Sequence, residues 1–223
     1  MIKVVVFDLD DTLYNEKDFV FGAFKEVAIY LSKKYGISAN ILYEDMLSIL
    51  HKEGRGKIFN IICDNYNINE DIKALVQVYR NSKPKLNLYE DSIEILNKLR
   101  CKYKLGLITD GLAYVQWNKI KILDLEKHFD NIIVTDELGR EYWKPHIMPF
   151  QNMADKFKVS PKECIYIGDN PSKDFFGAKK IGYKTIRIIR QEGDHIKARL
   201  DKNYEADYDI SSLDELIPII QDI

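Results

Sequence analysis

Hydrophobic and polar positions change their spacing along the chain, and each change predicts a different element. Val4 to Phe7 form a run of four apolar residues, three of them β-branched. Such a run is typical of a strand buried on both faces of a parallel sheet. From about residue 15 to residue 82, apolar residues such as Val20 and Phe24 instead recur at helical spacing, with no strand pattern among them. This stretch is therefore predicted to be entirely helical.

A third pattern begins near residue 83, where apolar strands alternate with amphipathic helices. The predicted strands cover residues 105–108, 132–134, 164–167 and 184–189, and the predicted helices cover residues 90–101, 113–123, 147–157 and 171–180. Such alternation indicates βαβ units and a parallel sheet. The segment after Gln191 is polar and is expected to form a loop. A last helix is predicted near residues 213–221, preceded by a Ser212–Glu215 capping box.

These elements predict an α/β fold with two parts. Residues 1–14 and 83–223 are expected to form a Rossmann-like core around a parallel sheet. Residues 15–82 are expected to form a helical domain inserted after the first strand. A length of 223 residues accommodates such a core with one smaller insertion.

Composition and charge exclude several classes of function. The chain has 33 basic and 35 acidic residues, and the basic residues are scattered, so no nucleic-acid surface is expected. No apolar run approaches the roughly 20 residues of a membrane span, and the N-terminal residues do not resemble a signal peptide. The three cysteines, Cys63, Cys101 and Cys164, lack paired or metal-binding spacing. They are expected to be reduced thiols of a cytoplasmic protein.

Acidic residues follow two of the predicted strands and indicate a metal site. Asp8 and Asp10 come directly after the first strand, and Asp169 follows the strand at 164–167. If the extended conformation continues to Asp10, the side chains of Asp8 and Asp10 leave the chain on the same side. Crowded carboxylates repel one another unless a cation lies between them. Since the carboxyl ends of parallel strands form a ligand-binding edge, Asp8, Asp10 and Asp169 are predicted to bind Mg²⁺ through oxygen atoms.

Other residues at the same edge are suited to a phosphoryl group. Thr109 ends a predicted strand and offers a hydroxyl donor, and the backbone N–H groups that follow it at Asp110 favour an anion. Lys144, whose backbone is restricted by Pro145, offers a positive charge that can stabilise a transferring phosphoryl group. Asp174 adds a further carboxylate near Asp169.

The order of these residues resembles the motifs of the haloacid dehalogenase-like superfamily of hydrolases. The matching residues are Asp8-Leu9-Asp10-Asp11-Thr12, Thr109, Lys144-Pro145, and Gly168-Asp169 with Asp174. The resemblance spans the whole chain and implies a Rossmann-like catalytic core. It also implies that residues 15–82 form a helical cap of type C1, as in the phosphatase subgroups of the superfamily.

The resemblance also implies a role for each residue. Asp8 would be the nucleophile that forms an aspartyl phosphate, and Asp10 would act as general acid and then as general base. Mg²⁺ would be held by the Asp8 carboxylate, the Asp10 backbone carbonyl and Asp169, with Asp174 in support. Thr109, Asp110 and Lys144 would bind the phosphoryl oxygens.

The chain departs from the family pattern at two places. Asp110 stands where asparagine usually follows the threonine of the second motif, and it adds negative charge near the phosphate. The segment from Gly139 to Lys144 is longer than usual, and His146 occupies a position where an acidic residue is common. The alternative interpretation of Lys144 is a solvated surface lysine. The alternative interpretation of Asp174 is an acid in the first turn of a helix, favoured there by the helix dipole.

The predicted function is a Mg²⁺-dependent phosphatase for a small phosphorylated metabolite, acting as a monomer or a small homo-oligomer. Three alternatives stay open. A phosphosugar mutase would share all of these motifs. A 2-haloacid dehalogenase would need neither the metal ligands nor the acid at Asp10, so Asp10 and Asp169 argue against it. A catalytically inactive binding or regulatory module would have no use for an intact nucleophile and metal set.

Overall fold

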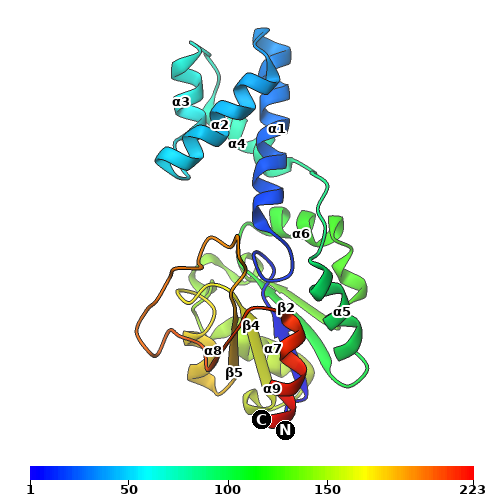
Figure 1. Ribbon diagram of the computed structural model, residues 1–223. Coiled ribbons are helices and arrows are strands. Elements are labelled where there is room, and N and C mark those ends of the chain that lie inside the picture. The colour runs from blue at the N-terminus through cyan, green and yellow to red at the C-terminus, as the bar shows by residue number, and fades with distance from the viewer. The chain divides into compact units, whose positions relative to one another are not determined.

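Two compact units make up the chain, which the computed structural model describes in full from residue 1 to residue 223 (Figure 1). The larger unit comprises Met1–Glu16 and Leu86–Ile223, and the smaller unit comprises Lys17–Lys85. The larger unit contains every strand, and the smaller unit is helical. No helix of either unit combines the length and the hydropathy that a membrane span requires.

A single six-stranded parallel sheet forms the centre of the larger unit, in the order β3-β2-β1-β4-β5-β6. The strands are β1 (Val4–Phe7), β2 (Lys104–Thr109), β3 (Asn131–Val134), β4 (Cys164–Gly168), β5 (Lys184–Ile188) and β6 (Tyr208–Ile210). This is the order of a Rossmann-type sheet, so the predicted α/β fold class is confirmed. β6 is a correction, because the segment after Gln191 was expected to contain no strand. Of its three residues only Ile210 is buried, so β6 has no apolar run to reveal it.

Helices cover the two faces of this sheet. α7 (Met148–Phe157) and α8 (Phe176–Ile181) pack against one face, where Val4 and Val6 belong to their hydrophobic cluster. α5 (Glu90–Leu99) and α6 (Ala113–Ile122) contact β2 and β3 with residues outside that cluster, so they cover the opposite face. Alternate residues of β1 thus point into two different apolar layers.

Irregular segments and a terminal helix complete the larger unit. Short 3-10 turns occupy Leu125–Lys127, Thr135–Leu138, Arg140–Tyr142, Pro161–Glu163 and Leu213–Glu215. The last of these leads into α9 (Leu216–Asp222), and the capping box between Ser212 and Glu215 is present as predicted. The helix expected over 171–180 starts later, at Phe176. Before it, the Asn170 side chain accepts hydrogen bonds from the backbone and hydroxyl of Ser172, and these stabilise a turn instead of a helix.

The smaller unit consists of helices built on the periodicity seen in the sequence. Its elements are α1 (Glu16–Tyr35), α2 (Ala39–Glu53), α3 (Ile58–Asn65) and α4 (Ile72–Asn81). The first residue of α1, Glu16, still belongs to the larger unit. Residues such as Phe24, Leu42, Met46 and Leu75 are buried in one apolar cluster. Gly36 directly follows helix α1, and its φ of 72° suits glycine at a helix C-terminus.

Candidate active site

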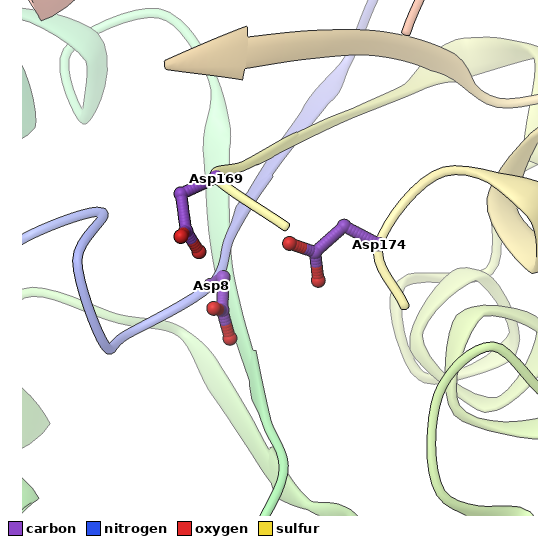
Figure 2. A group of neighbouring side chains, drawn as sticks. All are labelled: Asp8, Asp169 and Asp174. Carbon is purple, nitrogen blue, oxygen red and sulfur yellow. The ribbon is translucent and has the colours of Figure 1, made fainter. Parts of the chain in front are cut away.

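Three buried carboxylates lie together beyond the carboxyl ends of β1 and β4. Asp8 follows β1, and Asp169 follows β4, the neighbour of β1 in the sheet. The chain reverses its direction of strand addition between these two strands, and ligands of open parallel sheets bind at such a point. Asp174 comes from the turn before α8. One carboxylate oxygen from each of the three residues lies within 4.8 Å of the other two (Figure 2).

Burial and mutual repulsion favour a cation among these carboxylates. Burial, opposed by the charge of Lys144, raises the pKa of Asp8 to about 7. Burial, reinforced by the charges of Asp174 and Asp8, raises the pKa of Asp169 well above its ordinary value. A divalent cation would remove this repulsion. The oxygen donors are those that Mg²⁺ prefers, so the chemistry of the cluster fits this ion.

Lys144 is the central cation of the site. Its side chain is 2% exposed, and its Nζ atom lies 2.7 Å from Oδ1 of Asp8 and 2.8 Å from Oδ1 of Asp174. It also donates to the hydroxyl of Tyr166 at 3.0 Å. Burial alone would lower the pKa of Lys144, but the charges of Asp174 and Asp8 outweigh it and raise the pKa well above its ordinary value. The interpretation of Lys144 as a solvated surface lysine is therefore wrong.

Asp174 is an internal residue and not an acid in the first turn of an exposed helix. It is fully buried and precedes α8, which begins at Phe176. Its Oδ2 atom accepts a hydrogen bond from the backbone N–H of Asn170 at 2.9 Å. Gly168 provides the space for this carboxylate, because a Cβ atom at Gly168 would lie 2.4 Å from Oδ2 of Asp174.

Asp10 does not join the three buried carboxylates through its side chain. Strand β1 ends at Phe7, and the following turn, in which Asp11 has a φ of 52°, directs the Asp10 carboxylate toward α6. Asp8 and Asp10, two positions apart in the sequence, therefore contact different lysines, Lys144 and Lys119.

Three side chains hold the Asp10 carboxylate in this direction. Lys119 donates to it at 2.7 Å, Tyr14 at 2.5 Å and Gln116 at 2.9 Å. Burial by itself would raise the pKa of Asp10, but the Lys119 charge and these hydrogen bonds outweigh burial and lower the pKa. Asp10 is thus held in its charged form.

Asp110 uses its carboxylate to support neighbouring loops. Its Oδ1 atom accepts from the hydroxyl of Thr135 at 2.7 Å and from the backbone N–H of Lys144 at 3.2 Å. Its Oδ2 atom lies 3.7 Å from Nζ of Lys173, which is partly exposed. Asparagine is usual at this position in the family, and Asp110 adds a negative charge there. The Asp110 carboxylate is directed toward the segments after β3 and β4.

Thr109 stands at the end of β2, with 1% of its surface exposed. The register of the sheet explains its position: Phe7, the last residue of β1, pairs with Leu107 of β2 and with Ile167 of β4, so β2 extends to Thr109, two residues beyond the end of β1. The hydroxyl oxygen of Thr109 is 2.6 Å from the amide nitrogen of Gln116.

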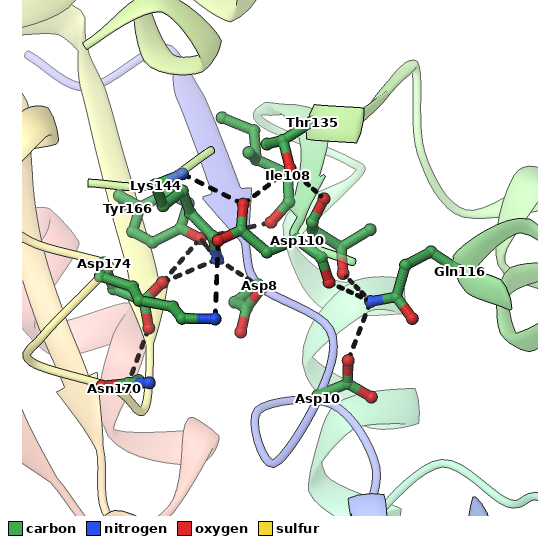
Figure 3. A network of polar contacts seen from close by, with 12 residues as sticks. Asp8, Asp10, Ile108, Asp110, Gln116, Thr135, Lys144, Tyr166, Asn170 and Asp174 are labelled. Carbon is green, nitrogen blue, oxygen red and sulfur yellow. Dashed lines mark hydrogen bonds and ion pairs between the residues drawn. The ribbon is translucent and has the colours of Figure 1, made fainter. Parts of the chain in front are cut away.

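The polar network that joins these residues includes three that the sequence interpretation missed: Tyr166, Gln116 and Lys119. Figure 3 shows Tyr166 beside Lys144 and Gln116 beside Asp10. Tyr166 lies inside an apolar strand, so its position in the sequence indicates only a strand residue. Gln116 precedes Ile120 by one helical turn, so it shares the buried face of α6. A polar residue on a buried helical face was the only available indication of its role.

Together these residues form a small site with a carboxylate nucleophile candidate, a buried lysine and a threonine hydroxyl at one sheet edge. The carboxylates can bind a cation, and the lysine and hydroxyl can bind oxygen atoms of an anion. Such an arrangement is suited to a group that carries several negative charges, such as a phosphoryl group.

Comparison with known proteins identifies similar chains over the full length. The sequence model of the family described as "Haloacid dehalogenase-like hydrolase" matches residues 5–188. The glyceraldehyde 3-phosphate phosphatase of Methanocaldococcus jannaschii is 35% identical, and the alignment covers 100% of this chain and 99% of that protein. The pyrophosphatase PpaX of Bacillus mycoides is 26% identical over 100% of this chain and 98% of its own length.

A solved structure is also similar. The crystal structure of a HAD phosphatase from Thermococcus onnurineus superimposes with a TM-score of 0.66 at 30% identity, covering 98% of each chain. The similarity of sequence and of structure therefore extends over both units.

Proposed function

The chain belongs to the haloacid dehalogenase-like hydrolase family, and we propose that it is a Mg²⁺-dependent phosphatase acting on a small phosphorylated metabolite. The single observation that carries the proposal is the position of Asp8. This carboxylate lies at the switch point of the sheet, within 4.8 Å of two further carboxylates and in contact with the buried Lys144. A nucleophile, a cation site and a fixed positive charge are thus available to one phosphoryl group.

Asp8 would attack the phosphorus atom and displace the alcohol of the substrate. The new bond joins a carboxylate oxygen of Asp8 to phosphorus, and the bond from phosphorus to the leaving oxygen breaks. Water then hydrolyses the aspartyl phosphate and restores Asp8. Lys144 holds Oδ1 of Asp8 at 2.7 Å, so one oxygen of the carboxylate is fixed while the other stays available for attack.

Asp10 would transfer the protons in both steps. The leaving oxygen receives a proton from Asp10 in the first step, and Asp10 removes a proton from water in the second. The contacts with Lys119, Tyr14 and Gln116 stabilise its charged form, which is the form required for the second step. The first step requires that Asp10 bind a proton before the substrate reacts.

Thr109 and Lys144 would bind the phosphoryl oxygens, and Asp8 and Asp169 would hold Mg²⁺ with the backbone carbonyl of Asp10. The ion, when bound, neutralises charge that develops on the phosphoryl oxygens. Asp174 supports the site by its contacts with Lys144 and the backbone of Asn170. We assign the helical unit, residues 17–85, the role of the cap that the family resemblance implies.

The substrate proposal begins with glyceraldehyde 3-phosphate, because the relative that is 35% identical bears that name. Inorganic pyrophosphate is the second candidate, on the weaker similarity to PpaX. The free cysteines, Cys63, Cys101 and Cys164, fit a reducing compartment, and we propose that the enzyme acts in the cytoplasm.

The experiment is a measurement of phosphate release from a panel that contains both candidates, other sugar phosphates and nucleoside monophosphates. Each compound is tested with Mg²⁺ and with a chelator, on the wild type and on Asp8→Asn. Asp124→Asn serves as the control, because Asp124 is an exposed carboxylate whose φ of 51° asparagine also adopts readily.

The proposal expects release that requires Mg²⁺, is lost in Asp8→Asn and is kept in Asp124→Asn. Release that persists in Asp8→Asn would exclude Asp8 as the nucleophile. A phosphorylated isomer as product, without free phosphate, would indicate the mutase. Binding of a compound of the panel without any reaction would favour a catalytically inactive binding module.

A further inference from the structure

Gln116 contacts Asp10, and it also contacts Thr109, a relationship that the reaction described above does not use. It lies in the first half of α6 and is 2% exposed. Its amide nitrogen is 2.6 Å from the hydroxyl oxygen of Thr109, 2.7 Å from the backbone carbonyl of Asp110 and 2.9 Å from Oδ2 of Asp10 (Figure 3). One amide group therefore contacts both the residue assigned to the phosphoryl oxygens and the residue assigned to proton transfer.

The chemistry of its partners determines which way the Gln116 amide points. The backbone carbonyl of Asp110 can only accept a hydrogen bond, and so can the ionised carboxylate of Asp10. The nitrogen of the amide, and not its oxygen, must face these two groups, because the amide oxygen would repel them. The orientation of the amide thus follows from its neighbours and does not depend on an arbitrary assignment.

This orientation also determines the direction of the Thr109 hydroxyl. An amide N–H can only donate, and the two N–H hydrogens of Gln116 are shared among three acceptors, of which Thr109 Oγ1 is the nearest at 2.6 Å. Thr109 therefore accepts from Gln116 through a lone pair of Oγ1. The hydroxyl hydrogen is then free to donate to another group. Thr109 Oγ1 donates to no acceptor within the protein, although the residue is buried at the edge where the phosphoryl group is proposed to bind.

Gly111 provides the space that Gln116 requires. The φ of Gly111 is 130°, a conformation that residues with a side chain rarely adopt. A Cβ atom at this position would lie 3.2 Å from both Cγ and Cδ of Gln116. Because residue 111 is glycine, the turn after β2 leaves room for the Gln116 amide to contact the backbone carbonyl of Asp110.

We propose that Gln116 is a positioning residue that directs the Thr109 hydroxyl hydrogen toward the transferring phosphoryl group. By occupying the lone pair of Thr109, Gln116 makes the hydroxyl a donor to the phosphoryl oxygen. The same amide also contacts the Asp10 carboxylate, so it holds the Thr109 hydroxyl and the Asp10 carboxylate in position relative to each other. This inference rests on the proposed phosphatase function.

Two substitutions distinguish hydrogen-bond direction from packing. Gln116→Met keeps the length of the side chain but removes its donor, so the Thr109 hydroxyl can turn toward the Asp110 carbonyl instead. Gln116→Glu keeps the size and presents acceptors, which would draw the hydroxyl hydrogen away from the phosphoryl group. We expect Gln116→Met to lower kcat/KM by about 10- to 100-fold, as for the loss of an oriented donor, and Gln116→Glu to lower it at least as much.

A double-mutant cycle with Thr109→Val tests whether Gln116 acts through Thr109. In the Thr109→Val background, the loss of kcat/KM caused by Gln116→Met should be limited to the part that acts through Asp10. The combined loss of kcat/KM in the double variant should therefore be clearly smaller than the sum, in free energy, of the two single losses. Thr109→Ser keeps the hydroxyl and should keep most of the effect of Gln116→Met. Thermal unfolding of each variant shows whether it is folded before its kinetics are compared.

The affinity for inorganic phosphate in the presence of Mg²⁺, measured by calorimetry, provides a readout that does not depend on turnover. The expected result is weaker binding in Gln116→Met than in the wild type, with no further weakening in the Thr109→Val background. Gln151→Met is the matched control, because Gln151 lies on α7 and donates to Asp155 in an exposed pair. It should behave as the wild type.

The outcomes separate this inference from the proposed function. Additive losses in the cycle, or equal phosphate affinity in the wild type and Gln116→Met, would overturn the role of Gln116 even if the wild type is an active phosphatase. A wild type that releases no phosphate from any substrate would overturn the proposed function. In that case the calorimetric comparison still decides whether Gln116 and Thr109 act together on the anion.

Discussion

The Nζ atom of Lys144 lies 2.7 Å from Oδ1 of Asp8, and both side chains are almost completely buried. The same nitrogen lies 2.8 Å from Oδ1 of Asp174. A lysine that bridges two buried carboxylates keeps the Asp8 carboxylate in one orientation. It also places a positive charge beside the group that Asp8 is proposed to attack, so Lys144 is expected to act on both stability and turnover.

Replacement of Lys144 by methionine should lower kcat by about 100-fold or more, because the charge that stabilises the transition state is lost. It should also lower the free energy of unfolding by roughly 3–5 kcal/mol in chelator, since Asp8 and Asp174 lose their buried partner. Steady-state kinetics and denaturant unfolding check the two effects. Lys98→Met is the control, because Lys98 is half exposed and its ion pairs lie on the surface; equal effects in the two variants would contradict the assignment.

Two substitutions of Asp110 should distinguish the effect of its hydrogen bonds from the effect of its negative charge. Asp110→Ala removes the acceptor for the Thr135 hydroxyl and the Lys144 backbone N–H, so Lys144 should shift and kcat/KM should fall by about 10- to 100-fold. Asp110→Asn keeps a carbonyl oxygen for both donors and should recover most of this loss. Kinetics of the two variants at one pH decide the matter. If Asp110→Asn were as impaired as Asp110→Ala, the negative charge and not the hydrogen bonds would be the important property.

Binding of Mg²⁺ should stabilise the protein more at pH 8 than at pH 5. In the metal-free state burial raises the pKa of Asp8 to about 7, whereas an unfolded aspartate titrates near about 4. Between these values the folded state binds more protons than the unfolded state, so the contribution of Asp8 to stability falls as the pH rises. At pH 5 protons compete with Mg²⁺ for the buried carboxylates. At pH 8 the carboxylates are charged, and Mg²⁺ relieves the repulsion among them.

Thermal unfolding with Mg²⁺ and with chelator, measured at both pH values, checks this prediction. Asp169→Asn should lose most of the increase in Tm on addition of Mg²⁺, because Asp169 is a proposed ligand. An increase of the same size at pH 5 and pH 8 would argue against the buried carboxylates as the binding site, as would an unchanged increase in Asp169→Asn.

Asp91 should stabilise the larger unit through Arg190. Its carboxylate accepts from Arg190 at 2.6 Å and from the backbone N–H of Leu213 at 3.0 Å. Burial alone would raise the pKa of Asp91, but these hydrogen bonds and the Arg190 charge outweigh it and lower the pKa. A lowered pKa means that the stabilisation is complete above the unfolded value, near about 4, and is lost as the pH falls through the folded value.

Asp91→Asn should therefore lower the free energy of unfolding by about 1.5–3 kcal/mol at pH 7, the range for hydrogen bonds to charged groups. The difference from the wild type should decrease toward pH 3. Urea unfolding over this pH range measures it. Glu94→Gln, which alters an exposed ion pair on the same helix, should change stability by less than about 1 kcal/mol at either pH. A difference for Asp91→Asn that does not depend on pH would contradict the electrostatic explanation.

Local sequence pattern was sufficient to predict the fold class and the strand ends that carry chemistry. Hydrophobic periodicity reports burial, and the apolar runs that became β1, β2 and β4 were long enough to predict a parallel sheet. In such a sheet all carboxyl ends lie at one edge whatever the strand order. Residues that follow the runs, such as Asp8, Thr109 and Asp169, could therefore be grouped without knowing which strands are neighbours. β6 escaped because only one of its three residues is buried.

The pairing of polar side chains at that edge of the sheet depends on contacts that form only in the folded chain. The turn after β1 directs Asp10 to Lys119 and Gln116, which are more than a hundred residues away in the sequence. Lys144 reaches two carboxylates, and Asp110 turns its carboxylate toward the Lys144 backbone. Periodicity identifies which positions are buried, but the partner of a buried polar group depends on turn geometry and on the rotation of each helix about its axis. These are properties of the packed chain and not of any local segment.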